Sequence, residues 1–449
     1  MTKESFTNKR PLLKNRKFNS TSVEEFIQTC KNQIADKEIF RLFENCFPNA
    51  LDTTITYSLH EGIPDTFIIT GDIDAMWLRD STAQVWSYLR FIKNDQALRN
   101  LILGVINRQV KCLNIDPYAN AFSPEPVDTP WKNDLTEMKP KVYERKWELD
   151  SLCYPFRLMN EYYKLTGDTS FINENLKNAA EKILIVLKEQ RGEKEKSSYK
   201  FQRVTAVATD TLPLGGYGNP SKPCGLINSA FRPSDDACTF SFHIPSNLFA
   251  AKVFMEFSEI QEIKNYLKKI PDQLRKISEE ILEAIYLHAI EDHMEFGKIY
   301  PYEIDGFGNK LFMDDANIPS LLSLPYLGIT KTDDPVYSAT RKFLLSDKNP
   351  YYFEGEFAEG IGSPHSGIKK VWHLHLITRA LTSDDDDEIV HCLTAIKRTH
   401  AGTGFMHEAF NVNNPDDFSR SWFAWANSMF GELIADLLDR RPYILSNRF

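Results

Sequence analysis

Amphipathic helical periodicity recurs along most of the chain and is the feature that most constrains its fold. In residues 176–190, apolar side chains return at the three- and four-residue spacing of a helix, opposite a face of lysines and glutamates. The same period returns in residues 274–285 and 422–437, whereas strand-like alternation is rare and short. The sequence therefore predicts an all-α protein whose helices each bury one face.

The length of the chain suits one closed helical architecture. If a helical hairpin with its connections takes roughly 70 residues, the 449 residues hold about six hairpins, the number that closes an (α/α)6 barrel, or six-hairpin α-toroid. The composition does not shift along the chain, and no Ser/Gly linker interrupts the sequence. We therefore predict a single (α/α)6 domain over residues 26–449, preceded by an N-terminal tail or docking segment over residues 1–25.

The balance of charge restricts the partners. With 53 basic and 62 acidic residues the formal net charge is −9, which argues against nucleic acid or an anionic membrane and favours a neutral ligand. The sequence shows no apolar run of signal-peptide length at its N-terminus, and no run of about 18 apolar residues. Seven scattered cysteines without a C-x-x-C pair favour reduced thiols. These features predict a cytoplasmic protein and leave its oligomeric state open.

Four long connections rich in Gly, Pro, Asn and aromatic residues separate the predicted helices: residues 117–131, 213–234, 353–367 and 400–417. Loops of this length in a compact protein usually carry function. We therefore expect the functional site to draw on these loops.

The first segment dense in acids, residues 70–81, combines three aspartates with Trp77 and Arg79 directly before an apolar helix. A structural interpretation has Asp80 or Ser81 capping that helix, with Arg79 paired locally. A functional interpretation has Arg79 and Asp80 binding sugar hydroxyls beside Trp77, which offers a stacking or wall surface. An EF-type calcium loop is excluded, because an apolar residue stands where that loop needs an oxygen ligand.

The second acidic segment, residues 225–238, places Asp235 and Asp236 next to each other and close to Arg232. Adjacent acids point in different directions, so one can cap the following helix while the other projects into a cleft. The sequence pattern does not decide which of the two acids caps the helix and which projects into the cleft.

The third segment, residues 403–411, sets Glu408 between His407 and aromatic residues in a loop rich in Gly and Asn. It is not a zinc motif, because Asn411 stands where the second histidine of H-E-x-x-H would be. His365 follows a Gly-Ser-Pro turn and is a second candidate to face the cleft.

The remaining patterns point to carboxylate chemistry without a metal. The acidic run 384–388 precedes an apolar helical pattern and is interpreted as a helix N-terminus rather than a metal site. Nucleophile-elbow, Walker and Rossmann fingerprints do not occur in the sequence. We therefore expect no metal and no cofactor. A pair of carboxylic acids, one protonated and one ionised, is the simplest catalytic device left, and glycoside hydrolysis uses such a pair.

Five separated motifs together resemble glycoside hydrolase family 125, the exo-α-1,6-mannosidases. They lie in family order at residues 70–81, 225–238, 314–328, 360–367 and 402–410. The resemblance runs from about residue 70 to the C-terminus. It implies a metal-free (α/α)6 barrel that hydrolyses α-1,6-mannosides with inversion and releases mannose from the non-reducing end. The implied substrate is a mannose-containing oligosaccharide or N-glycan fragment.

The resemblance also implies roles for single residues. Asp235, rather than Asp236, would be the general acid and Glu408 the general base, with their carboxyl groups roughly 6.5–9.5 Å apart to admit a water molecule. Membership of the motifs implies a set of substrate-binding residues: Asp72, Trp77, Arg79, Asp80, Arg232, Asp236, Asp315, Asn317, His365 and His407.

Two positions depart from the pattern of the family, since Asp74 stands where Pro is expected and Ala409 where Ser is common. Neither departure removes a carboxylate, so they affect substrate detail more than chemistry. Two alternatives stay open: a related inverting α-toroid glucosidase, and a sugar-binding protein that has lost catalysis.

Overall fold

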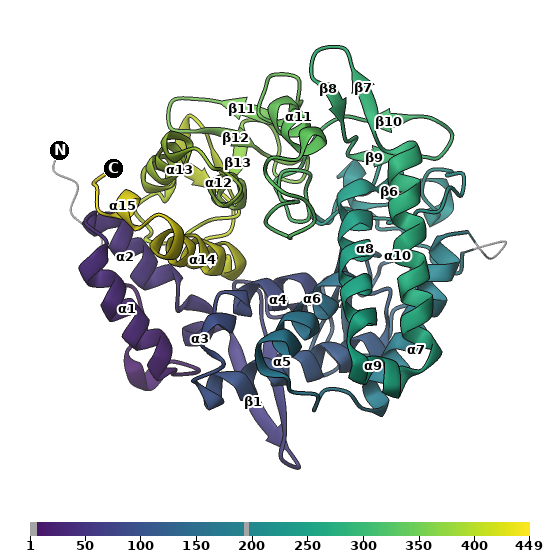
Figure 1. Cartoon of the computed structure of the whole chain (residues 1–449), viewed down its shortest axis with the longest axis horizontal. Helices are drawn as coiled ribbons and strands as arrows, with labels where there is room; N and C mark the ends of the chain where they lie inside the picture. The colour runs from purple at the N-terminus through teal and green to yellow at the C-terminus, as the bar shows by residue number, and fades with distance from the viewer. Residues whose placement is uncertain (1–6, 193–196) are drawn as a thin grey trace. The chain divides into compact units, whose positions relative to one another are not determined.

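The structure, a computed structural model, describes residues 7–192 and 197–449 (Figure 1). The described residues divide into two compact units. Unit 1 comprises the described residues up to Met76, together with Asp80–Val105 and Tyr352–Phe449. Unit 2 comprises Trp77–Arg79 and Ile106–Tyr351. The highly charged sequence of residues 192–200, which predicts a solvated loop, falls partly outside the described residues.

Unit 1 is mainly helical, and its long C-terminal helix is its centre of packing. Its helices are α1 (Thr21–Gln33), α2 (Lys37–Cys46), α3 (Asn49–Thr53), α12 (His373–Leu381), α13 (Asp386–Thr399), α14 (Ala424–Arg440), α15 (Pro442–Leu445) and the 3-10 turns η1 (Leu13–Asn15) and η2 (Leu89–Phe91). Helix α14 packs against α2, α3, α12 and α15. Helices α4 (Leu78–Trp86) and α5 (Gln96–Ile115) carry residues of both units.

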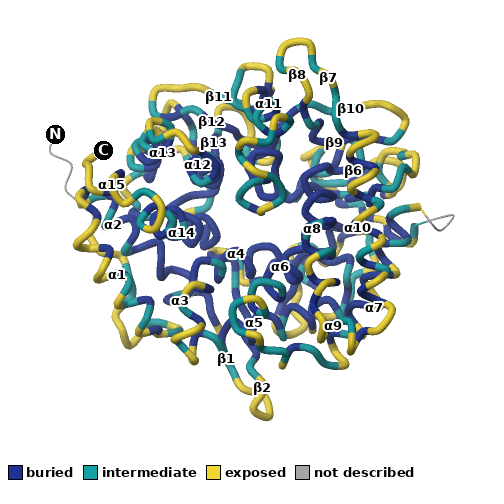
Figure 2. The backbone as a smooth tube through the Cα atoms, in the orientation of Figure 1, coloured by how far each residue is buried: buried dark blue, intermediate teal, exposed yellow. Residues whose placement is uncertain are grey.

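Unit 2 is built around a layer of long helices. Its helices are α6 (Leu149–Thr166), α7 (Glu174–Gln190), α8 (Ile244–Glu259), α9 (Gln261–Leu267), α10 (Lys269–His288), α11 (Pro335–Leu344) and the 3-10 turns η3 (Ala208–Asp210) and η4 (Leu214–Gly216). Helix α8 packs against both α6 and α10, and α10 also contacts α7 and α9. The apolar face of each helix is thereby buried, while the outer face of α10 stays exposed (Figure 2).

The helical periodicity of the sequence predicted these elements correctly. The segments 176–190 and 274–285 are confirmed as parts of α7 and α10, and the segment 422–437 as part of α14 from Ala424 on. The acidic run at residues 384–388 is confirmed as a helix start, because the Asp385 side chain accepts a hydrogen bond from the backbone N–H of Asp387 at the beginning of α13.

The strands are two to six residues long, as expected. Unit 1 contains β1 (Ile55–His60), β2 (Ile63–Ile68), β11 (Tyr352–Glu354), β12 (Glu359–Ile361), β13 (Lys370–Trp372), β14 (Ala409–Asn411) and β15 (Asn414–Phe418). Unit 2 contains β4 (Ala121–Phe122), β5 (Val142–Glu144), β6 (Phe242–His243), β7 (Glu291–His293), β8 (Gly297–Ile299), β9 (Glu303–Ile304) and β10 (Lys310–Leu311), and β3 (Met76–Trp77) has one residue in each unit. They tie the long loops together rather than form a core sheet.

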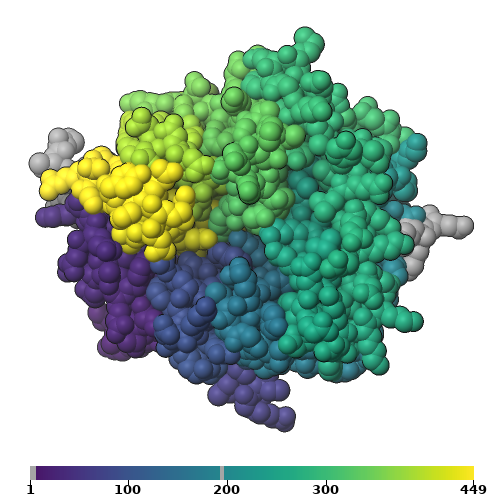
Figure 3. Space-filling view, viewed as in Figure 1, coloured from purple at the N-terminus to yellow at the C-terminus, as the bar shows by residue number. Residues whose placement is uncertain are grey.

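The hairpin of β1 and β2 is the longest paired element of unit 1. Its register runs from Ile55 opposite Ile68 to His60 opposite Ile63. The two turn residues, Glu61 and Gly62, have φ angles of 53° and 82°, as the right-handed twist of a two-residue hairpin requires. The tip protrudes from the surface of unit 1 (Figure 3).

The segment before α1 is held by buried charge. Arg10 donates hydrogen bonds to Asp52 at 2.8 Å and to Glu24 at 3.0 Å. Helix α1 begins at Thr21, so the expected boundary between residues 25 and 26 lies inside a helix.

Two features concern the predicted reduced thiols and the predicted lack of a membrane span. All seven cysteines are free thiols, and six of them are buried. Among the described residues, none of the helices is both long and apolar enough to cross a membrane.

Candidate active site

The two acids singled out in the sequence belong to different units, Asp235 to unit 2 and Glu408 to unit 1. In unit 2, Asp235 occupies a tight turn. The Asp235 N–H donates to the Arg232 carbonyl at 2.9 Å, and the Arg232 N–H donates to the Asp236 carbonyl at 2.7 Å. The φ angle of Asp235 is +66°, a left-handed conformation that costs a residue other than glycine about 1 kcal/mol. The turn therefore holds Asp235 in a conformation that its surroundings must stabilise.

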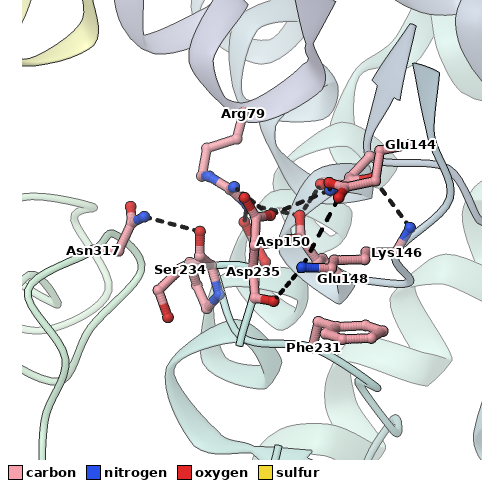
Figure 4. Close-up of polar contacts among 12 residues, drawn as sticks. Arg79, Glu144, Lys146, Glu148, Asp150, Phe231, Ser234, Asp235 and Asn317 are labelled. Carbon is pink, nitrogen blue, oxygen red and sulfur yellow. Dashed lines mark hydrogen bonds and ion pairs between the residues drawn. The ribbon is translucent and has the colours of Figure 1, made fainter. Parts of the chain in front are cut away.

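Lys146 stabilises this turn through a hydrogen bond to its main chain. Its ammonium group donates a hydrogen bond of 2.7 Å to the backbone carbonyl of Asp235 and lies 5.0 Å from the centre of the Phe231 ring (Figure 4). Asp210 anchors the same ammonium group at 2.6 Å. Burial acts to lower the pKa of Lys146, but the carboxylates of Glu144, Asp235 and Asp210 outweigh it and raise the pKa above its usual value. The ammonium group of Lys146 therefore stays protonated next to the turn.

The Asp235 carboxyl group is held by side chains from two other segments. Asn120 Nδ2 donates to Asp235 Oδ1 at 3.2 Å, and Arg79 NH2 lies 3.6 Å from the same oxygen. Asn120 is itself fixed, because its Nδ2 also donates to Glu144 and its Oδ1 accepts from the Lys146 N–H. The Asp235 side chain is 25% exposed, so it is the acid of this group that a ligand can reach.

Two buried acids lie behind Asp235, at the start of α6. Arg79 NH1 donates to Glu148 at 2.8 Å and to Asp150 at 2.9 Å, and both side chains are fully buried (Figure 4). Burial raises the pKa of Glu148 well above its usual range and also raises that of Asp150, although the Arg79 guanidinium opposes both shifts. Arg79 is therefore paired with acids 69 and 71 residues away along the chain.

A second ion network extends from Lys146 into the neighbouring loops. Arg203 NH2 donates to Asp134 at 2.6 Å and to Glu144 at 2.9 Å, and Arg203 NH1 donates to Asp210 at 2.9 Å. The Arg203 guanidinium also covers the Trp131 ring at 3.6 Å. The long loops of unit 2 are thus joined through charge.

The other side of the Asp235 turn is held by the segment after β10. Ser234 Oγ donates to Asp315 at 2.8 Å and lies 3.3 Å from Asp236, and Asn317 Nδ2 donates to the Pro233 carbonyl at 2.9 Å. Burial, followed by the nearby charge of Asp236, raises the pKa of Asp315 to about 6. These three predicted site residues, Asp236, Asp315 and Asn317, are brought together with Asp235.

The structure corrects the expectation that one acid of the second segment caps a helix. Neither Asp235 nor Asp236 caps the following helix, because α8 begins at Ile244 and its N-cap is His243. Arg232 is buried and bonds Glu303 at 2.6 Å, so it supports the turn from inside the unit.

In unit 1, Glu408 lies directly before β14. Ser419 Oγ donates to Glu408 Oε2 at 3.0 Å, and Arg420 NH1 lies 3.7 Å from Glu408 Oε1. Ser419 Oγ also accepts from the Ala409 N–H, so the hydroxyl joins the end of β15 to the start of β14. Glu408 is thus oriented by a hydroxyl donor and faces a cation.

His407 supports Glu408 from within the fold. Its ring stacks on Phe418 with centroids 3.7 Å apart, Nε2 lies 3.1 Å from Thr403 Oγ1, and Nδ1 lies 3.1 Å from the Arg420 carbonyl. Burial lowers the pKa of His407, which keeps the ring neutral. His407 therefore acts as a support for the loop in this structure, and both its ring nitrogens face protein atoms.

Of four further predicted residues, Asp72 and Asp80 lie near the same Arg420 guanidinium as Glu408, whereas Trp77 and His365 lie elsewhere in their units. Asp72 accepts from Arg420 Nε at 2.8 Å, and Asp80 is buried within the electrostatic reach of that guanidinium. Trp77, in unit 2, is 7% exposed and its ring packs edge-on against that of a tyrosine. His365 is exposed, with its ring 6.2 Å from that of a tryptophan. The helix α4 starts at Leu78, so Asp80 lies in its first turn rather than at its N-cap.

The sequence reasoning missed four residues that define these sites: Glu148, Asp150, Lys146 and Arg420. Two acids at the start of a largely apolar segment, residues 147–156, were an available signal for the first two. The other two follow from contacts that no local pattern reveals. Over residues 7–192 and 197–449, the structure has no group of three or more His, Cys, Asp or Glu arranged to hold a metal ion.

Comparison with known proteins identifies the family. The sequence matches the family model described as metal-independent alpha-mannosidase (GH125) over residues 36–435. The Meiotically up-regulated gene 157 protein of Schizosaccharomyces pombe is 44% identical over 455 residues, 97% of this chain and 89% of that protein. A metal-independent α-mannosidase of Streptococcus pneumoniae, solved as a non-productive complex with α-1,6-mannobiose, is 40% identical, with a TM-score of 0.90 over 95% of this chain and 100% of that one.

A more distant likeness concerns the fold alone. A bacterial glucoamylase complexed with acarbose is 12% identical with a TM-score of 0.51, over 83% of this chain and 51% of that one. The predicted all-α toroid class of fold is confirmed by these likenesses. Because the family model covers most of the chain and both near relatives are at least 40% identical, the chain is a glycoside hydrolase and belongs to family 125, the metal-independent α-mannosidases.

Proposed function

We propose that the protein is an inverting, exo-acting α-1,6-mannosidase, with Asp235 as general acid and Glu408 as general base. The observation that carries this proposal is the contrast between the surroundings of the two acids. Asp235 is grouped with two buried acids, Glu148 and Asp150, a setting that favours a protonated carboxyl group. Glu408 accepts a hydrogen bond from the Ser419 hydroxyl and faces the Arg420 guanidinium, which it shares with the partly exposed Asp72 rather than with fully buried acids.

The proposed mechanism gives each acid one role. Asp235 gives its proton to the glycosidic oxygen while the bond from that oxygen to the anomeric carbon breaks. Glu408 takes a proton from a water molecule, whose oxygen attacks the anomeric carbon from the opposite face. Inversion requires the two carboxyl groups to lie roughly 6.5–9.5 Å apart in the working enzyme.

The substrate follows from the relatives. Because the Streptococcus pneumoniae enzyme was solved with α-1,6-mannobiose, we propose the non-reducing end of an α-1,6-linked mannose oligosaccharide or N-glycan fragment as the substrate. The proposed ligand-facing residues are Asp72, Trp77, Asp80 and His365. Arg79, Arg232, Asp236, Asp315, Asn317 and His407 then act mainly by holding the acids. The seven free thiols support a reducing, cytoplasmic location.

The direct test is hydrolysis of α-1,6-mannobiose beside its α-1,2 and α-1,3 isomers, with the anomer of the released mannose followed by NMR. Release of β-mannose first, from the 1,6 isomer alone, is the expected result. Release of α-mannose first would refute the role of Glu408 as a base, and activity on glucosides instead would point to the related α-toroid glucosidase.

A further inference from the structure

Three carboxyl groups surround one guanidinium in unit 2. Arg79 lies 2.8 Å from Glu148, 2.9 Å from Asp150 and 3.6 Å from Asp235. If all three acids were ionised, three negative charges would face one guanidinium whose side chain is 3% exposed, and Lys146, the other cation near Asp235, is already shared by Asp210 and Glu144. A buried uncompensated charge is costly, so at least one of the three acids retains a proton.

The contacts indicate where that proton lies. Glu148 Oε2 accepts from Arg79 NH1 and from Ser151 Oγ, each at 2.8 Å, whereas Glu148 Oε1 is buried and receives no N–H or O–H donor. The carboxyl group of Asp235 is a hydrogen-bonding neighbour of Glu148. Two carboxyl groups can form a hydrogen bond only if one of them carries a proton. Asp150 also has an oxygen without a donor, but its hydrogen-bonding side chain is Arg79 alone.

We propose that Glu148 is a positioning residue of the reaction, whose carboxyl group shares one proton with Asp235 and so keeps Asp235 able to protonate the leaving group. This inference rests on the proposed function, because it assumes that Asp235 is the general acid. Glu148 is fully buried and does not touch the substrate; it acts through Asp235, whose side chain is partly exposed.

The balance of charge through one turnover is simple. Before the reaction the Asp235–Glu148 pair holds one proton and one negative charge, next to the positive charge of Arg79. Asp235 gives that proton to the glycosidic oxygen, and the pair then carries two negative charges. It regains a proton from solvent through Asp235, because Glu148 is closed to water. The double charge beside Asp150 makes this uptake favourable.

The charged groups facing the pair come from several elements. Arg79 approaches from the start of α4, Asp150 from α6, and Lys146 from the segment before α6. Burial comes first among the causes that raise the pKa of Glu148, the Arg79 cation opposes the shift, and Asp235 and Asp150 add to it. The phenol of Tyr199 also faces Glu148. Lys146 favours ionisation of Asp235, so Glu148 and Asp150 are the groups that keep a proton there.

The test compares two substrates that differ in how much they need an acid. α-1,6-Mannobiose has a poor leaving group that must be protonated, whereas 2,4-dinitrophenyl α-mannoside has one that leaves unaided. For Glu148→Gln we expect kcat/KM to fall at least about tenfold on mannobiose and less than about threefold on the dinitrophenyl substrate. The basic limb of the pH profile on mannobiose should move about one unit toward acid, because the glutamine amide donates to ionised Asp235.

Asp150→Asn is the matched control, since it is equally buried, bonds the same guanidinium and lacks the hydrogen bond to Asp235. It should lower activity on both substrates by similar factors. The ratio of the two activities does not depend on the folded fraction of a sample. Glu148→Asp, which keeps the charge but withdraws the carboxyl group from Asp235, should show the same selective loss to a smaller degree. Equal losses on both substrates for the Glu148 variants, with an unmoved basic limb, would overturn the inference.

Asp235→Asn separates this inference from the proposed function. If Asp235→Asn loses mannobiose activity selectively and Glu148→Gln does not, Asp235 remains the acid and only the sharing of the proton is refuted. If Asp235→Asn shows no selective loss, Asp235 is not the acid and both proposals fall.

Discussion

Lys146 Nζ donates a 2.7 Å hydrogen bond to the backbone carbonyl of Asp235, whereas the carboxyl group of that residue accepts from Asn120. A cation bound to the carboxylate itself would promote its ionisation more strongly. By bonding the main chain, Lys146 fixes the left-handed turn at Asp235 while Asn120 and Glu148 determine the state of the carboxyl group. Lys146 thus fixes the position of Asp235 through the main chain, while Glu148 and Asp150 oppose the ionisation that the ammonium group favours.

Lys146→Met should lower kcat about 10- to 100-fold with a small change in KM, because the turn that orients Asp235 loses its donor. It should also lower the free energy of unfolding by about 3 kcal/mol, since Asp210 and Glu144 lose their buried cation. Steady-state kinetics and urea unfolding measure both effects. Lys132→Met, which removes an exposed ion pair with Asp128, should change neither. A change in KM alone would refute the positioning role.

Ser419→Ala should lower kcat/KM about tenfold, because Glu408 loses the hydroxyl that orients it and β14 loses a backbone contact. The loss should be similar for mannobiose and for 2,4-dinitrophenyl α-mannoside, since a base is needed with either leaving group. Ser446→Ala, which removes an exposed hydrogen bond to a backbone carbonyl, is the control. A selective loss on mannobiose would contradict the assignment of Glu408 as the base.

Asp314 should make the protein less stable as the pH rises. Burial raises its pKa in the folded state from 3.8 to about 8, although the backbone N–H groups of Leu322 and Leu321 oppose the shift. The folded state therefore binds a proton that the unfolded state has released, and this contribution is full below about pH 4 and lost as the pH approaches 8. Urea unfolding between pH 5 and pH 8 should show a smaller decline for Asp314→Asn than for the wild type. Asp347→Asn, which changes an exposed side chain, should keep the wild-type decline.

Extended dialysis against EDTA should leave kcat/KM for α-1,6-mannobiose unchanged, because the family is metal-independent and both proposed catalytic groups are carboxyl groups. The same preparation should show the same midpoint of thermal unfolding before and after dialysis. Activity lost to EDTA and restored by a divalent cation would contradict this expectation.

The helical part of the fold could be predicted from the sequence, because the periods of α7, α10 and α14 depend on neighbours three and four residues away. The start of α4 could not be placed correctly. Its first turn contains Arg79, whose partners lie at positions 148 and 150. A local pattern carries no information about charges that meet across about 70 residues of chain.

The candidate site shows the same division. The motifs located Asp235 and Glu408, and membership of a motif also named His407 as a ligand-binding residue. The structure places the His407 ring against Phe418, with both nitrogens facing protein atoms. Motif residues are shared within a family whether they touch the substrate or hold a residue that does, and only contacts separate the two.

The ion network of Lys146, Arg203, Asp134, Glu144 and Asp210 has a consequence for directed evolution of this enzyme. Each charged side chain in the network forms an ion pair with at least one other. A single substitution therefore leaves a buried partner without its counter-charge. Libraries that randomise one of these positions at a time will therefore recover mostly unstable variants. New loop conformations in unit 2 require that two oppositely charged partners be replaced together, so productive substitutions near Asp235 are expected to be double substitutions.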